Sequence, residues 1–132
     1  MANNDRFRAL FKKHIAKAKD KTEMFAKMLA IDIDAALVMR SPVDTGRFRA
    51  NWMVGIGAIN TETFERFSDV SHEPLINSIK VNGQTIYITN SLPYAQRLEY
   101  GWSKQAPDGM VRLTVAEMSS RAANVGVYLR AF

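Results

Sequence analysis

Cysteine is absent from this chain of 132 residues, and histidine occurs only at His14 and His72. Without cysteine the chain can form no disulfide, thiol nucleophile or thiolate metal site. The two histidines lie far apart and outside any spacing such as HExxH, so we expect no metal site. The GxxxxGK(S/T), GxGxxG and GxSxG patterns are also missing, and "VGIGAI" holds only a fragment of the second. We therefore expect no cofactor and no catalytic activity.

Long apolar runs are missing as well. No stretch approaches the roughly 20 apolar residues that span a bilayer, and the N-terminus lacks the apolar segment of a secretory signal. We expect a protein that is made in the cytoplasm and has no membrane partner. Its hydrophobic share of 47% and charged share of 23% are typical of a globular protein. The length indicates a single domain over residues 1–132.

Proline and glycine do not occur between Asp5 and Arg40. Apolar side chains recur there at steps of three and four, which is typical of one stripe of a helix. A helix over residues 5–40 would be roughly 50 Å long, more than the core of such a domain needs. It therefore either breaks near "KDKT" or projects. Pro42 disfavours helical geometry at Ser41, so the helix should end at about Arg40.

The part after this helix, residues 41–132, predicts an α+β body. In "SPVDTGRFRANW" the "VDTG" segment predicts a turn with Gly46 at positive φ, and "NWMVGIGAI" predicts a strand. Residues 61–73 are expected to form a short helix or an irregular segment. Asn82-Gly83 between two alternating runs predicts a hairpin near residues 76–90, with Ile79 and Val81 opposite residues 85–89.

Two further helices are expected. "LPYAQRLEYG" predicts a short helix, and residues 110–129 predict a terminal helix opened by Pro107 and capped by Asp108. The order of elements indicates an α+β fold. In this fold the long N-terminal helix, 1–40, and the C-terminal helix pack on a small antiparallel sheet.

Positive charge is concentrated near the N-terminus. Residues 6–21 contain a single acid, Asp20, and the seven cations Arg6, Arg8, Lys12, Lys13, Lys17, Lys19 and Lys21. Such a face attracts nucleic acid or an acidic protein surface, or is only a solvated helix face. Lys12, Lys13, Lys17 and Lys19 are the candidates for contact with DNA or an acidic partner. No zinc finger, RNP-type strand or clear helix-turn-helix is present, so base-specific readout is not expected.

Large aromatic side chains lie in or beside the predicted turns, with arginines nearby. Aromatic residues and arginine are enriched at protein–protein contacts. The alternative is that these aromatics close a small core. The candidate subunit contacts are Asp44, Arg47, Phe48, Arg49, Tyr94, Arg97, Tyr100 and Trp102. Charge reversal at Arg47 and Arg49 is expected to leave the monomer folded and to block assembly.

Two motifs in this order resemble the tail-component family named after the tenth gene product of phage HK97. The first is Pro42-Val43-Asp44-Thr45-Gly46, followed by Arg47, Phe48 and Arg49. The second is Asn90, then Pro93-Tyr94-Ala95, then Leu98-Glu99-Tyr100-Gly101. The likeness extends from about residue 10 to residue 125. Trp102 stands where relatives often have a small residue, and the segment 61–77 fits the family pattern only loosely.

The resemblance implies a virion structural protein of a tailed phage, located in the neck or tail. Such a protein is a neck or tail-completion subunit that joins the head connector to the tail around the DNA channel. Its implied partners are copies of itself in a hexameric or dodecameric ring and neighbouring head-closure, tail-terminator or tail-tube proteins. Non-specific contact with packaged DNA is also implied. The alternative is a small basic nucleic-acid-binding protein that uses the N-terminal helix.

Overall fold

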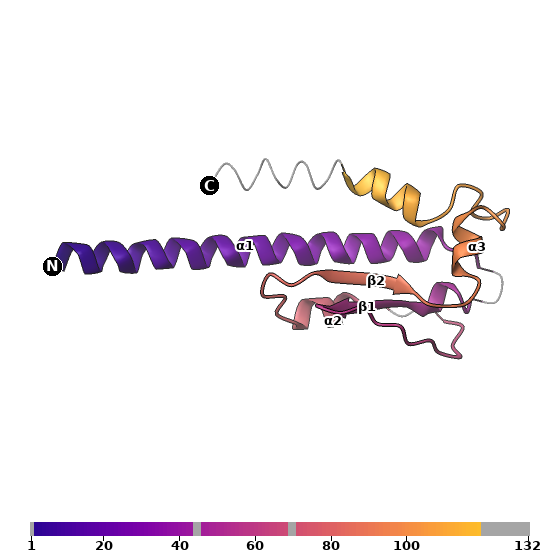
Figure 1. The fold of residues 1–132 in the computed structure, drawn as a ribbon, viewed down its shortest axis with the longest axis horizontal. Coiled ribbons are helices and arrows are strands. Elements are labelled where there is room, and N and C mark those ends of the chain that lie inside the picture. Colours follow the sequence, from indigo (N-terminus) through magenta and orange to yellow (C-terminus); the bar gives the residue numbers. More distant parts are fainter. Residues whose placement is uncertain (1, 44–45, 69–70, 120–132) are drawn as a thin grey trace.

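The longest element of the molecule is α1, Ala2–Arg40, an unbroken helix of 39 residues. The computed structural model describes residues 2–43, 46–68 and 71–119. At 1.5 Å per residue α1 is about 58 Å long. It does not break at "KDKT", where the hydroxyl of Thr22 donates to the carbonyl of Ala18 at 2.9 Å. Its C-terminal part lies along the body and its N-terminal part projects (Figure 1).

The end of α1 at Arg40 is the one that Pro42 predicts. The next residue, Ser41, is buried and links the helix to the body. Its hydroxyl donates to the carbonyl of Leu37 at 2.6 Å and accepts the indole N–H of Trp52 at 2.8 Å. Because both bonds are buried, they fix the direction in which the chain leaves the helix.

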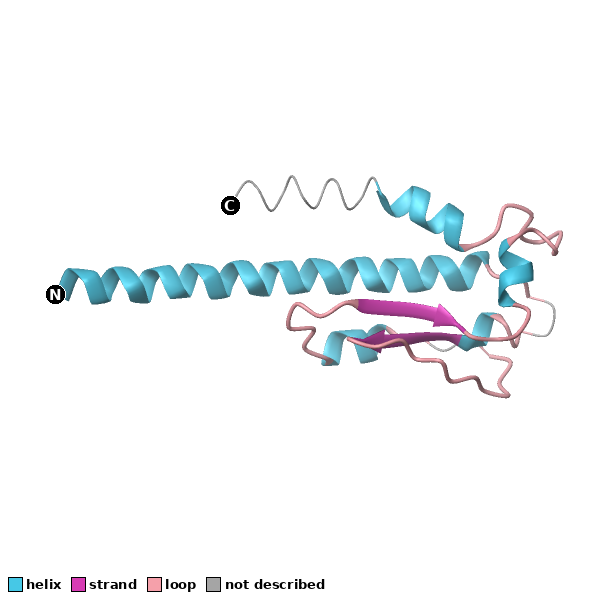
Figure 2. Cartoon of the chain, viewed as in Figure 1, coloured by secondary structure: helices cyan, strands magenta, loops and turns pink. Residues whose placement is uncertain are grey.

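The sheet has two antiparallel strands, β1 (Trp52–Ile56) and β2 (Ile86–Asn90). A short 3-10 helix, η1 (Arg49–Asn51), leads directly into β1. Trp52 lies opposite Asn90, and Ile56 lies opposite Ile86. The predicted strand in "NWMVGIGAI" is confirmed over β1, and so is the small antiparallel sheet (Figure 2).

The predicted hairpin near residues 76–90 is wrong in its pairing, because β2 pairs with β1. The turn itself forms: Asn82 and Gly83 both have positive φ, and the amide of Gln84 donates to the carbonyl of Val81 at 3.0 Å. However, residues 73–78 are helical, and the amide of Val81 donates to a carboxylate of α1. The segment before the turn therefore forms no strand.

Residues 57–68 form neither helix nor strand, which agrees with the irregular alternative for this region. The helix nearby is α2, Glu73–Ser78, which starts later than predicted and has Pro74 in its first turn. Proline is accepted there because the first amides of a helix have no partner within the helix. The loop 57–68 and α2 lie on the side of the sheet away from the helix 111–119 (Figure 1).

The core lies where the C-terminal half of α1 meets the sheet. One cluster of buried side chains includes Leu37, Phe48, Trp52, Leu92, Ala106 and Met110, and a second contains Ala30, Val54 and Ile76. The predicted short helix is confirmed as α3, Ala95–Glu99. Residues 111–119 are helical, and the rest of the predicted terminal helix lies outside the described residues. The α+β fold class is thus confirmed.

Candidate assembly surfaces

The N-terminal part of α1 forms a solvent-exposed arm, residues 4–20, in which every residue is exposed. It carries an apolar stripe made of Phe7, Leu10, Phe11 and Ile15, with Phe7 66% and Phe11 57% exposed. Steps of three and four place these side chains on one face. The rings of Phe7 and Phe11 are stacked, with centroids 6.2 Å apart. A row of large exposed apolar side chains is typical of a contact surface.

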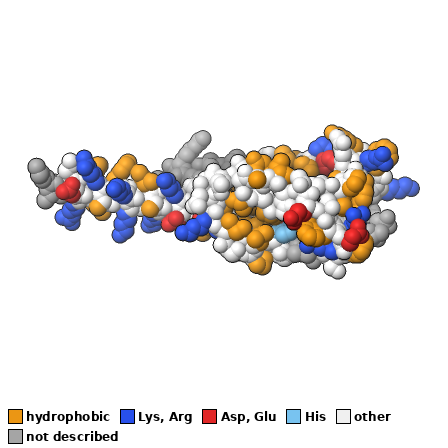
Figure 3. Space-filling view, turned by 60° about the horizontal axis from the view of Figure 1, so that its bottom comes forward, with side chains coloured by type: hydrophobic (Ala, Val, Ile, Leu, Met, Phe, Trp, Pro, Cys, Tyr) orange, Lys and Arg blue, Asp and Glu red, His pale blue; other side chains and the backbone are white. Residues whose placement is uncertain are grey.

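The net charge of the chain is concentrated on the arm and the residues next to it. Residues 1–22 hold seven Lys or Arg residues and two acids, which accounts for the whole formal charge of +5, so residues 23–132 are neutral. At about 100° per residue, the cations follow both edges of the apolar stripe. Figure 3 shows Lys and Arg along the projecting part, with hydrophobic side chains between them. The predicted candidates Lys12, Lys13, Lys17 and Lys19 are all exposed there.

The arm joins the body at Glu23, whose role the sequence does not reveal. Its carboxylate accepts the backbone N–H groups of Val81 and Asn82, the latter at 2.9 Å. The bond from Asn82 is the main cause that lowers the pKa of Glu23. Desolvation opposes it, and the bond from Val81 and two nearby lysines add to it. A charged carboxylate on α1 therefore holds the 81–84 turn.

An open notch of about 860 Å³ lies between the arm and this turn. Its lining includes Ile15 and Ala18 from α1 and Val81 from the turn. The apolar face of the arm thus continues into the body, and a partner on the stripe would also meet the turn.

Aromatic packing accounts for part of the predicted contact surface after α1. Phe48 is buried, with its ring edge-on to Trp52 at 5.7 Å and tilted against Tyr94 at 6.0 Å. The expectation that Phe48 makes a subunit contact is therefore wrong, because its ring fills the core. Tyr94 is half-buried against the same cluster. Asp44, also predicted as a contact, lies outside the described residues.

The two arginines of this turn have partners within the chain. Arg49 donates to the carbonyls of Met39 and Ser41 at 3.1 and 3.2 Å. Its positive charge lies at the C-terminal end of α1, where a cation interacts favourably with the helix dipole. Arg47 forms an ion pair with Glu65 at 2.9 Å. Charge reversal of Arg49 would remove these bonds and oppose the helix dipole. We therefore revise the expectation that the doubly reversed variant keeps a fully stable monomer.

An exposed aromatic patch, Tyr100 and Trp102, is the part of the predicted surface that remains available. Tyr100 is 64% and Trp102 is 72% exposed. The guanidinium of Arg97 lies 5.0 Å from the centroid of the Trp102 ring, and that of Arg112 lies 5.5 Å from the Tyr100 ring. Cations over ring faces hold these side chains in place without burying them. The structure thus brings together the predicted residues Arg97 and Trp102, and it pairs Tyr100 with Arg112, which the sequence did not single out.

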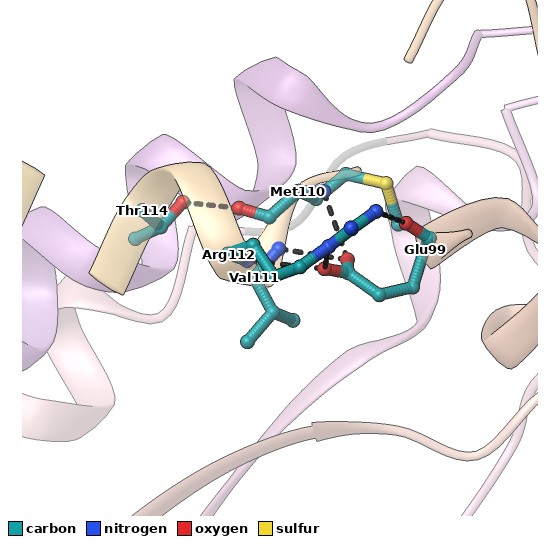
Figure 4. A network of polar contacts seen from close by, with 5 residues as sticks. All are labelled: Glu99, Met110, Val111, Arg112 and Thr114. Atoms are coloured by element: carbon teal, nitrogen blue, oxygen red, sulfur yellow. Dashed lines mark hydrogen bonds and ion pairs between the residues drawn. The ribbon is translucent and has the colours of Figure 1, made fainter. Parts of the chain in front are cut away.

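Glu99, the last residue of α3, contacts the start of the helix 111–119 (Figure 4). Its carboxylate accepts the amides of Met110, Val111 and Arg112 at 2.8, 2.9 and 3.0 Å, which caps the helix 111–119. Burial raises the pKa of Glu99, but these three bonds and the Arg112 side chain outweigh it, so the pKa is lowered. The sequence predicted Asp108 as the cap of this helix. In the structure the cap comes instead from Glu99 of α3. Gly109 permits the approach, since a Cβ there would lie 2.4 Å from the Glu99 carbonyl oxygen.

Asp34 and His72 form a buried pair that the sequence did not predict. Oδ2 of Asp34 on α1 lies 3.0 Å from Nδ1 of His72, and both residues are buried. The other oxygen, Oδ1, has no hydrogen-bond partner among the described residues. The pair ties the start of α2 to α1. No local signal indicates it, because the two residues lie 38 positions apart.

Comparison with family models, with curated proteins and with solved structures finds no match to this chain. In the part of the chain that the structure describes, no three His, Cys, Asp or Glu side chains come together as metal ligands. None of the described helices is long and apolar enough to cross a membrane.

Proposed function

We propose that this chain is a structural subunit of a tailed phage, forming a ring at the neck or tail-completion position around the DNA channel. The two sequence motifs suggest the family. The observation that carries the assembly role is the arm: a helix that leaves the body with an apolar stripe edged by cations. Exposed apolar patches of this kind mark surfaces that bind another molecule.

The aromatic patch supports the same proposal. Arg97, Tyr100 and Trp102 provide an exposed cluster of the residue types that dominate binding energy at interfaces. The patch directly follows α3, which lies at the end of the molecule opposite the tip of the arm (Figure 1). A subunit with contact surfaces at both ends suits a closed ring, in which unlike patches of neighbouring copies meet.

Deletion of the gene from a phage that carries it tests the proposal. We expect filled heads and separate tails to accumulate, which electron microscopy would count, and a supplied wild-type copy to restore joined particles. Normal joined particles in the deletion strain would contradict the proposal. Supplying a Trp102→Ala variant would then report on the aromatic patch, and Lys104→Ala, a neighbouring exposed residue, serves as its control.

The arm also supports a second candidate function, non-specific binding of nucleic acid. A helix with several phosphate contacts would show steep salt dependence, with affinity falling at least about 100-fold between 50 and 200 mM salt. A titration against duplex DNA measures this slope. A free chain that binds DNA tightly at physiological salt, in a phage that assembles normally without it, would favour this second function.

A further inference from the structure

The loop 61–68 has a composition complementary to that of the arm. It exposes two aromatic side chains, Phe64 and Phe67, and two acids, Glu62 and Glu65. The single cation in the loop is turned toward the body: Nε of Arg66 donates to the carbonyl of Ala50 at 2.7 Å, and its guanidinium lies over the Phe64 ring. The outward surface of the loop is therefore apolar and bears two acids, of which Glu65 is paired with Arg47, whereas that of the arm is apolar and basic.

The loop is also held in place, although it has no regular secondary structure. Asn51, which is fully buried, accepts the amide of Phe64 at 2.7 Å and donates to its carbonyl at 3.0 Å. The same side chain donates to the carbonyl of Arg47, and Arg47 pairs with Glu65. A preorganised loop loses little conformational entropy when a partner binds. The backbone of Phe64 is thus held in place, while the side chains of Phe64 and Phe67 stay exposed.

We propose that the apolar stripe of the arm docks on the loop 61–68 of a second copy of this chain. This inference rests on the proposed function and identifies the surfaces by which ring neighbours meet. Phe7 and Phe11 pack against Phe64 and Phe67, and the cations along the stripe face Glu62 and Glu65 of the other copy. The contact is head-to-tail, so each copy offers one arm and one loop and the chain of contacts can close.

Charge decides between this arrangement and a symmetric pairing of two arms. Two arms side by side would bring together two segments that each carry a net charge of +4, from six cations and two acids. Like charges at an interface cost binding energy, and the cost grows as water is excluded. The arm cannot reach its own loop, because α1 is a continuous helix that points away from the body. A second copy's loop supplies both the apolar surface and the opposite charge.

Sedimentation velocity of the full-length chain at concentrations up to about 300 µM and low salt tests the proposal. We expect the mean mass to rise with concentration and to fall back when salt is raised. The arm variant Phe7→Ser/Phe11→Ser and the loop variant Phe64→Ser/Phe67→Ser should each remain monomeric. Leu75→Ser, which changes an exposed apolar residue outside the loop, should associate like the wild type. Circular dichroism and thermal unfolding verify that every variant is folded.

A mixture of the two variants gives the sharpest result. The loop variant keeps an intact arm and the arm variant keeps an intact loop, so together they should form a one-to-one heterodimer that grows no further. A mixture that stays monomeric while the wild type associates would overturn the proposal. A loop variant that associates by itself like the wild type would overturn it in favour of arm–arm pairing, because that variant keeps an intact arm.

The same measurements distinguish a second copy of the chain from other partners that could bind the arm. The proposal would be overturned if the wild-type chain stays monomeric at every concentration. If that monomer binds vesicles of phosphatidylserine and phosphatidylcholine, the arm binds a lipid surface instead. These outcomes are separate from the test of the proposed function. If the free chain is monomeric but heads and tails fail to join without it, only the docking inference falls. If head-to-tail association occurs but joining is normal without the gene, only the proposed phage role falls.

Discussion

The two halves of α1 share one unbroken helix but have opposite relations to the rest of the molecule. From Ala30 to Arg40 the helix buries Ala30, Asp34 and Leu37 against the sheet and α2. From residue 4 to residue 20 every residue is exposed, and the segment carries +4 of the chain's net charge of +5. Backbone geometry does not distinguish the halves, since neither contains proline or glycine. The comparison shows that helical periodicity predicts an apolar stripe, but not whether the same chain covers it.

Removal of one leucine from each half should give the largest contrast. Leu37→Ala deletes a fully covered side chain from the core, and we expect a loss of about 3 kcal/mol in the free energy of unfolding. Leu10→Ala changes the arm, and the expected change is within about 0.5 kcal/mol. Urea unfolding of the two variants measures both values. An equal loss in the two variants would mean that the arm is packed within the monomer.

The buried pair should give the next largest effect. Asp34→Ala leaves the His72 ring buried without its acceptor, and we expect a loss of about 2 kcal/mol. Asp20→Ala removes an exposed carboxylate from the arm and should change stability little. A double-mutant cycle with His72→Ala isolates the interaction between the two side chains. If the stability losses of the two single variants add up to that of the double variant, the two side chains do not stabilise each other.

The cap on the helix 111–119 should contribute less and should depend on pH. Glu99→Gln replaces a charged acceptor of three amides, with an expected loss of about 1 kcal/mol at pH 7. Because the folded-state pKa lies below the ordinary value of 4.5, the contribution of Glu99 is fully present above pH 4.5. It is lost as the pH falls through the lower, folded-state pKa. The difference between the unfolding free energies of wild type and variant, measured between pH 3 and pH 7, should therefore shrink toward the acidic end.

Much of the fold could be predicted from local sequence patterns. The absence of proline and glycine predicted α1, Pro42 predicted where α1 ends, and Asn82-Gly83 predicted the turn. The pairing of β2 could not be predicted, because a carboxylate 58 residues away takes the amide of Val81. The cap by Glu99 is a similar case, since capping patterns consider only the residues next to a helix. Local rules thus failed where a side chain from another element supplied the partner.

The candidate contacts divide in the same way. Composition singled out Arg97, Tyr100 and Trp102 as candidate contacts. The structure leaves Tyr100 and Trp102 exposed and places Arg97 over the Trp102 ring, and their contact with a partner stays a prediction. Composition failed for Phe48, which lies in the same kind of segment but faces the core. Sequence alone could not separate these cases, since burial depends on where η1 and α3 place each ring.

The smallest expected effect lies at Glu23, the junction between the two halves of α1. Glu23→Gln should leave global stability nearly unchanged, because the carboxylate lies at the surface and water can replace its bonds. The local effect should be clear: the amides of Val81 and Asn82 lose a charged acceptor and should exchange with deuterium several-fold faster. The lowered pKa of Glu23 predicts that acidification below its ordinary value of 4.5 produces the same change in the wild type. After correction for intrinsic exchange rates, equal protection of both amides in wild type and variant would show that the body, and not α1, holds the turn.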